Sequence, residues 1–180
     1  ARNYQPIWVG NKNKARMKAL LNAVSSASEH GLPTAQYQIS ELKSALNAAR
    51  GTEGAAAEAF ATKIFLKYAH DLSSGVLEPK KVDKEIAVQP PRRSELALLD
   101  AIPRSSPSGF FKALAPKHPE YARLIKEKQR LEKILGHGGY GPDVPVATLK
   151  PGTSSKNVTK MRARLTALGY GRLGADPAFD

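Results

Sequence analysis

Apolar residues recur every three to four positions through most of this chain, and glycine and proline interrupt the pattern at short intervals. This spacing places apolar side chains on one face of an α-helix, so it predicts amphipathic helices rather than strands. Gly31 and Gly75 stand where two helices should end, and Ser94, Pro119 and Ser155 stand where three should begin. We expect a mainly α-helical fold with seven helices, over residues 12–30, 40–50, 55–73, 94–102, 108–114, 119–135 and 156–168.

Several local features refine this expectation. Ser40 is the expected N-cap of the second helix, and Gly51 and Gly54 are expected to separate that helix from the third. Residues 76–92 contain three prolines and are expected to form a connector without helix. Trp8, the only tryptophan, is expected to anchor the core.

The chain also changes character near its glycine-rich segment, residues 136–141. That segment lacks the lysine that ends a phosphate-binding loop, so it predicts a linker. We therefore expect a helical scaffold domain over residues 1–140 and a second unit over residues 146–180. The second unit is too short to bury much apolar surface, and it is expected to be the incomplete first part of a small domain.

Composition narrows the classes of function. The chain has 28 Lys and Arg against 16 Asp and Glu, a net charge of +12, which favours anionic partners. It has no cysteine, which excludes thiolate nucleophiles and suits an oxidising compartment such as the periplasm. No apolar run is long enough to span a membrane. The chain starts at Ala1, so we expect a processed product from which a signal peptide has been removed.

No pattern of residues predicts catalysis. The four histidines lack the short spacing of a zinc site, so no metal or other cofactor is expected. Ser40 and Lys43 match the S-x-x-K element of penicillin-binding enzymes, but the K-T-G element is absent. We expect no catalytic residue in this chain.

Nucleic acid is the less favoured anionic partner. The basic helix expected over residues 119–135 carries its aromatic side chain on the apolar face rather than among the charges. That arrangement is typical of a helix whose apolar face is packed and whose charged face lies in solvent.

Five stretches in the first part of the chain resemble the helical scaffold domain that precedes the catalytic domain in large periplasmic L,D-transpeptidases of the bacterial cell wall. They are His30–Pro33, Tyr37, Phe65–Pro79, Leu114–Tyr121 and Leu124.

Further along, Leu149–Gly152, Val158, Met161–Leu165, Leu168–Tyr170 and Asp176–Asp180 are similar to the opening of a small three-helix peptidoglycan-binding domain. In that family a basic amphipathic helix leads to a Leu-Gly-Tyr turn and an aspartate-containing stretch. The second helix that normally follows is absent here.

These resemblances imply a non-catalytic front portion of an L,D-transpeptidase, which scaffolds the enzyme and directs it to peptidoglycan. Such enzymes attack a stem peptide with a cysteine, so the activity would belong to a C-terminal catalytic domain outside this chain. The expected partner is peptidoglycan, through its stem peptides or its glycan. We expect Arg162, Arg164 and Tyr170 to lie near the binding groove; the alternative is solvated arginines and a packed Tyr170. The alternative function is a basic nucleic-acid-binding or adaptor protein.

Overall fold

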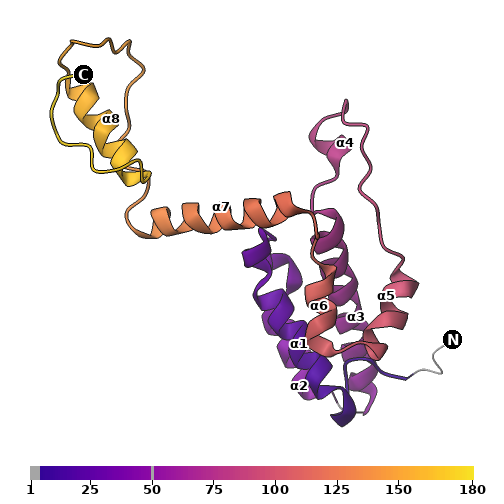
Figure 1. Cartoon of the computed structure of the whole chain (residues 1–180). Coiled ribbons are helices and arrows are strands. Elements are labelled where there is room, and N and C mark those ends of the chain that lie inside the picture. The colour runs from indigo at the N-terminus through magenta and orange to yellow at the C-terminus, as the bar shows by residue number, and fades with distance from the viewer. Residues whose placement is uncertain (1–4, 50) are drawn as a thin grey trace. The chain divides into compact units, whose positions relative to one another are not determined.

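The computed structural model describes residues 5–49 and 51–180, and within these the backbone forms helices and turns but no strand (Figure 1). The prediction of a mainly α-helical fold is confirmed. Four short 3-10 helices accompany the α-helices, at Asn11–Asn13, Ala27–His30, Thr34–Tyr37 and Ile102–Arg104. The α-helices are α1 (Lys14–Ser25), α2 (Ile39–Ala48), α3 (Gly51–Ser74), α4 (Pro79–Val82), α5 (Glu95–Ala101), α6 (Pro107–Leu114), α7 (Pro119–Gly136) and α8 (Lys156–Ala167).

The chain divides into two compact units, one that ends at Ile125 and one that runs over Lys126–Asp180. This division falls inside α7 and before the glycine-rich segment at which the sequence placed its boundary. The two domains predicted from the sequence, a scaffold domain over 1–140 and an incomplete domain over 146–180, therefore stay predictions.

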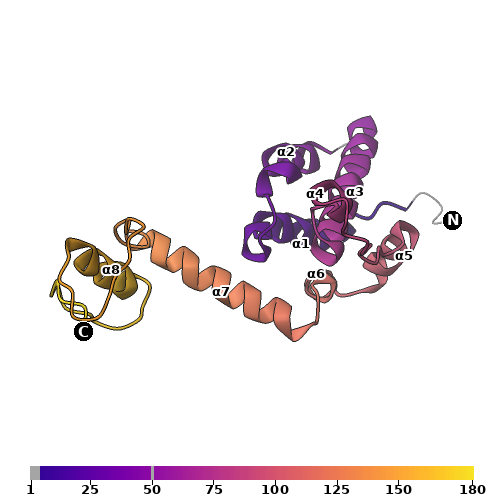
Figure 2. The ribbon, with the colours of Figure 1, turned by 90° about the horizontal axis from the view of Figure 1, so that it is seen from above.

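The core of the first unit forms around α3, the longest helix. Ile64, Phe65, Tyr68 and Leu72 recur at helical spacing on α3, and all four are buried. The α2 helix packs against α3, and α1 packs against α2 and α6, so these helices lie side by side in Figures 1 and 2. The predicted core anchor, Trp8, is fully buried, and its ring lies 5.1 Å from that of Phe65.

The segment that precedes α1 is attached to the α3 helix by a single carboxylate. The Glu58 carboxylate accepts hydrogen bonds from the backbone N–H groups of Ile7, Trp8 and Val9, at 2.5, 3.0 and 3.1 Å. The Trp8 indole N–H donates to the Thr62 hydroxyl at 3.1 Å, one turn further along α3. These bonds satisfy backbone donors that have no strand or helix partner, which allows Trp8 to enter the core.

Most of the predicted helix boundaries are confirmed. Gly31 and Gly75 have φ angles of 74° and 90°, the left-handed conformation that glycine adopts without strain after a helix. The Ser94 and Ser155 hydroxyls accept hydrogen bonds from the first-turn amides of Ala97 and Asn157, as N-caps do. Pro119 is the first residue of α7.

Three local predictions are wrong. The N-cap of α2 is Gln38, with a φ angle of 45°, and Ser40 lies in the first turn. Gly51 and Gly54 lie inside α3, which therefore begins earlier than expected, because its packing outweighs the low helix propensity of glycine. The connector contains the single turn α4, which tolerates Pro79 because proline needs no amide partner at a first position. The predicted end of the second helix at residue 50 lies outside the described residues.

The α7 helix also differs from expectation, because its apolar residues are not buried. Leu124 and Leu135 are 67% and 55% exposed. In the first unit, the start of α7 is held by Tyr121, whose hydroxyl lies 2.6 Å from Nδ1 of His30.

In the second unit, the segment around residues 175–180 lies against α8. Ala178 forms an antiparallel bridge with Ser154, and Val158 is the fully buried residue of this unit. Gly141 approaches α8 so closely that a Cβ atom there would lie 2.9 Å from the Arg164 Cα. The glycine-rich segment therefore packs on α8, whereas the predicted linker would make no such contact. None of the helices in the described part of the chain is long and apolar enough to cross a membrane.

Candidate functional site

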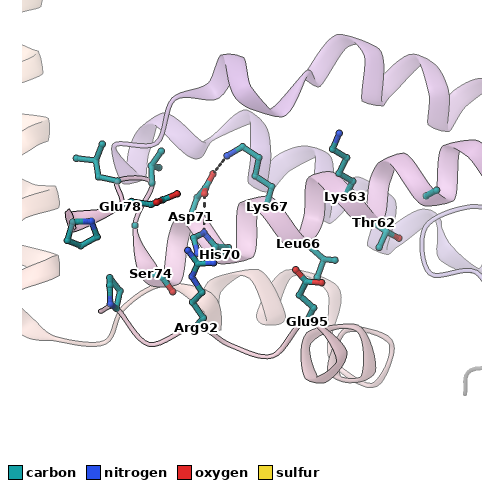
Figure 3. A pocket seen from close by; sticks show the side chains of 16 residues that line it. Thr62, Lys63, Leu66, Lys67, His70, Asp71, Ser74, Glu78, Arg92 and Glu95 are labelled. Atoms are coloured by element: carbon teal, nitrogen blue, oxygen red, sulfur yellow. Dashed lines mark hydrogen bonds and ion pairs between the residues drawn. The ribbon is translucent and has the colours of Figure 1, made fainter. Parts of the chain in front are cut away.

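A buried aspartate organises a polar cluster near the C-terminal end of α3 (Figure 3). The Asp71 side chain is 5% exposed and accepts a hydrogen bond from the Tyr37 hydroxyl at 3.0 Å. Its carboxylate also accepts from Lys67 Nζ at 2.8 Å and from His70 Nδ1 at 3.4 Å. A carboxylate in this position needs such partners, because burying an unpaired charge is strongly unfavourable.

Two elements bring this cluster together. Lys67 precedes Asp71 by four residues on α3, the spacing at which helical side chains meet. Tyr37 comes from the 3-10 helix before α2 and is fully buried, with its ring 5.6 Å from that of Tyr68 in an edge-on arrangement. The ammonium group of Lys67 lies 5.9 Å from the centre of the Tyr37 ring. The cluster thus joins the α2 side of the core to α3.

The buried phenols hold their protons more tightly than exposed tyrosines do. Burial raises the pKa of Tyr37 above its ordinary range, and the Asp71 charge and hydrogen bond raise it further. Burial also raises the pKa of Tyr68, to about 12, with smaller contributions from Tyr121 and Glu29.

These shifts predict a loss of stability in alkaline solution. The folded state keeps the Tyr37 and Tyr68 protons at pH values where an unfolded tyrosine, with a pKa of about 10, has released its proton. Their contribution is complete below pH 10 and falls as the pH rises toward 12, by up to about 1.4 kcal/mol per pH unit for each tyrosine. Urea unfolding between pH 8 and 12 should show this decline, and Tyr68→Phe should make it less steep. An equal slope in Tyr68→Phe would contradict the assignment.

A cavity of about 790 Å³ lies beside the cluster. It is bounded by the face of α3 that carries Lys63, Lys67 and His70, and by the connector that leads through α4 to α5 (Figure 3). The Ser74 hydroxyl donates to the carbonyl oxygen of Pro91 at 2.7 Å, which fixes the connector to the end of α3. A volume of this size is typical of sites for small organic ligands.

His70 is unusual in this site. Its Nε2 atom is buried and has no hydrogen-bond partner within the described residues. Such an atom is rare in folded proteins, because the missing hydrogen bond costs about 1–3 kcal/mol.

The three residues predicted to bind peptidoglycan all lie in the second unit, but the structure does not bring them together. The Arg162 side chain, 17% exposed, donates to the carbonyl oxygen of Ala178 at 2.9 Å and pairs with the carboxylate of Asp180. Arg164 donates toward the segment around Asp143, at 3.4 Å. Tyr170 is 73% exposed, so it does not pack in a core. Their role in binding stays a prediction.

A second cluster in this unit surrounds Arg130, which pairs with Glu127 at 2.7 Å and donates to the carbonyl oxygen of Leu168 at 3.2 Å. The hydrogen bond to the Glu127 carboxylate raises the pKa of Arg130. A shallow cavity of about 560 Å³ lies here, with cationic groups on its wall. Its lining residues are Arg130, Lys133, Ile134, His137, Gly139, Ala167, Leu168 and Gly169.

The residue types that the sequence analysis weighed as metal ligands and as a serine nucleophile can also be placed in the structure. Within the described residues, no group of three or more His, Asp or Glu side chains is placed to hold a metal ion. Ser40 and Lys43, the S-x-x-K pair, are exposed on α2, and neither has a hydrogen bond or ion pair in the described part of the chain. A serine nucleophile requires a base within hydrogen-bond reach.

The prediction of site residues missed the cluster on α3. A signal was present, because Asp71 lies among Tyr68, Leu72 and other members of the apolar stripe of its helix. A carboxylate in such a stripe indicates a buried polar network.

A comparison with protein families assigns the first unit to a known family. Residues 1–127 match the model of a family described as Scaffold domain, which is more than half of the 180-residue chain. The chain belongs to the Scaffold domain family. No curated protein and no solved structure matches it. The Scaffold domain match ends close to Ile125, where the first compact unit ends.

Proposed function

We propose that this chain is the non-catalytic scaffold portion of a periplasmic L,D-transpeptidase and directs that enzyme to peptidoglycan. The observation that carries the proposal is the Scaffold domain match over residues 1–127, which coincides with the stretches that resemble the transpeptidase scaffold. The match itself names no substrate and no enzyme.

The chemistry of the chain supports this role. With no cysteine, the chain cannot supply the thiolate that these enzymes use, so its contribution is positioning. Its charge of +12 attracts polyanions, and peptidoglycan stem peptides carry free carboxylates. The cationic cavity around Arg130 and the exposed Tyr170 give the second unit a surface suited to such a polymer.

Co-sedimentation of the purified chain with insoluble peptidoglycan sacculi tests the proposal. We expect the chain to pellet at physiological ionic strength in the presence of excess duplex DNA, because specific contacts should persist where non-specific electrostatic binding weakens. Failure to pellet, or release by DNA, would contradict the proposal, and release by DNA would favour the nucleic-acid-binding alternative.

Two matched variants locate the surface. Arg164→Gln and Arg172→Gln remove the same charge from the second unit, and Arg172 is exposed with no hydrogen bond or ion pair in the described part of the chain. We expect Arg164→Gln and Tyr170→Ala to reduce the pelleted fraction several-fold, and Arg172→Gln to leave it nearly unchanged. Equal effects of the two arginine substitutions would indicate binding through net charge alone.

A further inference from the structure

The connector between α3 and α5, residues 76–92, exposes apolar side chains that nothing in the described part of the chain covers. They are Leu77, Val82, Ile86 and Val88. Residues 81–89 are exposed without interruption. Figure 1 shows the connector leading away from the core helices, with α4 beyond the end of α3. Apolar side chains gathered on one projecting segment indicate an interaction surface.

The backbone of the connector is held before any partner arrives. The Ser74 hydroxyl donates to the Pro91 carbonyl oxygen at 2.7 Å, which holds the two ends of the connector together. After α4, Asp83 closes a turn, because its carboxylate accepts from the Glu85 N–H at 2.9 Å and its carbonyl oxygen accepts from the Ile86 N–H at 3.2 Å. A segment that is already folded loses little conformational freedom on binding, which favours affinity.

The residue types and the size of this surface favour a lipid bilayer over a protein partner. All four apolar side chains are aliphatic, whereas protein interfaces depend mostly on Trp, Tyr and Arg, with Leu and Val under-represented. The connector is also shorter than the roughly 20–30 residues that each partner contributes to a stable protein interface. A bilayer needs no such complementary surface, because binding to it grows with each aliphatic side chain that leaves water.

Cations accompany the apolar side chains. The connector carries Lys80, Lys81, Lys84 and Arg92 against Glu78, Asp83 and Glu85, and Arg93 follows directly. Lys81 binds Glu78 at 3.0 Å, whereas Lys80 and Lys84 make no hydrogen bond or ion pair within the described residues. A lysine can lay its apolar stem along a hydrophobic region while its ammonium group stays at the polar boundary. The net charge of +12 on the whole chain adds attraction to anionic lipid.

We propose that the connector docks on the surface of a bilayer that contains anionic phospholipid. Val82, Ile86 and Val88 enter the boundary between the headgroups and the acyl chains, and the lysines bind lipid phosphate groups. The acidic side chains limit the depth of insertion, because an unpaired carboxylate stays in water. The inference does not rest on the proposed function, whose test uses peptidoglycan without lipid.

Flotation of the full chain with lipid vesicles tests the proposal. We expect binding to vesicles of equal parts phosphatidylglycerol and phosphatidylcholine, and binding at least about tenfold weaker to phosphatidylcholine alone. The double variant Val82→Ser/Val88→Ser should weaken binding to the anionic vesicles at least about tenfold. The double variant Leu124→Ser/Val146→Ser also removes two exposed aliphatic side chains, but outside the connector, and should bind as the unchanged chain does.

Two results would overturn the proposal. One is the absence of binding to the anionic vesicles; if sedimentation velocity then showed a dimer that Val82→Ser/Val88→Ser abolishes, the surface would belong to a second copy of the chain. The other is equal binding by Val82→Ser/Val88→Ser and the unchanged chain, which would show adsorption through net charge alone.

A single fluorophore can report insertion directly, because the chain has no cysteine of its own. Val82→Cys labelled with the environment-sensitive fluorophore NBD should show a blue-shifted emission when anionic vesicles are added, because the probe enters a less polar environment. Val146→Cys labelled in the same way should show no shift. An unshifted emission from the probe at position 82 in the presence of bound vesicles would contradict docking through the connector.

Discussion

Replacing Asp71 with alanine is expected to lower the free energy of unfolding by about 3 kcal/mol. The substitution leaves the fully buried Tyr37 hydroxyl without its acceptor, and it removes the partner of Lys67 and His70. Most of the cost comes from Tyr37, because Lys67 is 37% exposed and regains water when its partner is lost. Urea unfolding followed by circular dichroism measures the change.

Two further variants make this expectation specific. Asp100→Ala removes a carboxylate from an exposed position on α5, and it should change the stability by less than about 0.5 kcal/mol. Combining Asp71→Ala with Tyr37→Phe should cost less than the sum of the two single changes, because the second substitution removes the orphaned hydroxyl. Additive effects would show that the bond between Tyr37 and Asp71 contributes nothing measurable.

Replacing Trp8 with alanine is expected to lower the free energy of unfolding by about 3–5 kcal/mol. The side chain is fully buried against Phe65, so its removal leaves a cavity in the centre of the first unit. It also leaves the Thr62 hydroxyl without the indole donor. Thermal and urea unfolding should both report the loss.

Trp8→Phe separates the two contributions. Phenylalanine keeps most of the aromatic packing but cannot donate to Thr62, so we expect a smaller loss of about 1–2 kcal/mol. If Trp8→Ala lowered the stability no more than Trp8→Phe does, the packing of the ring would not be the main stabilising effect.

Helix positions could be predicted where an apolar stripe and a capping residue agree. On α3 the stripe of Ile64, Phe65, Tyr68 and Leu72 identified the buried face, and Gly75 identified its end. Such signals act locally, within a few residues of the boundary that they set.

The failures occurred where tertiary packing overrides a local preference. Ser40 is a good N-cap, yet the chain enters α2 through Gln38 in a left-handed conformation. Gly54 weakens a helix, yet α3 continues through it. Neither outcome follows from the residues alone, because each depends on what the helix packs against.

The candidate site was less predictable than the fold. Lys67, His70 and Asp71 lie within one and a half turns of a helix, so their proximity follows once α3 is assigned. Tyr37 reaches Asp71 from another element, and sequence periodicity carries no information about such a distant contact. In the second unit, the predicted role of Arg162 in ligand binding stays a prediction. Its side chain also donates to the carbonyl oxygen of Ala178, which holds the segment around Ala178 on α8.

The bonds from Glu58 to the backbone of residues 7–9 have a consequence for folding. They join positions that are 51, 50 and 49 residues apart in the sequence, so forming them closes a long loop and costs chain entropy. That closure becomes favourable when α3 is already formed and presents Glu58 and Thr62 together. The irregular segment of residues 7–9 should therefore separate from α3 only in the cooperative unfolding of the core, rather than fray independently as segments near a chain end often do.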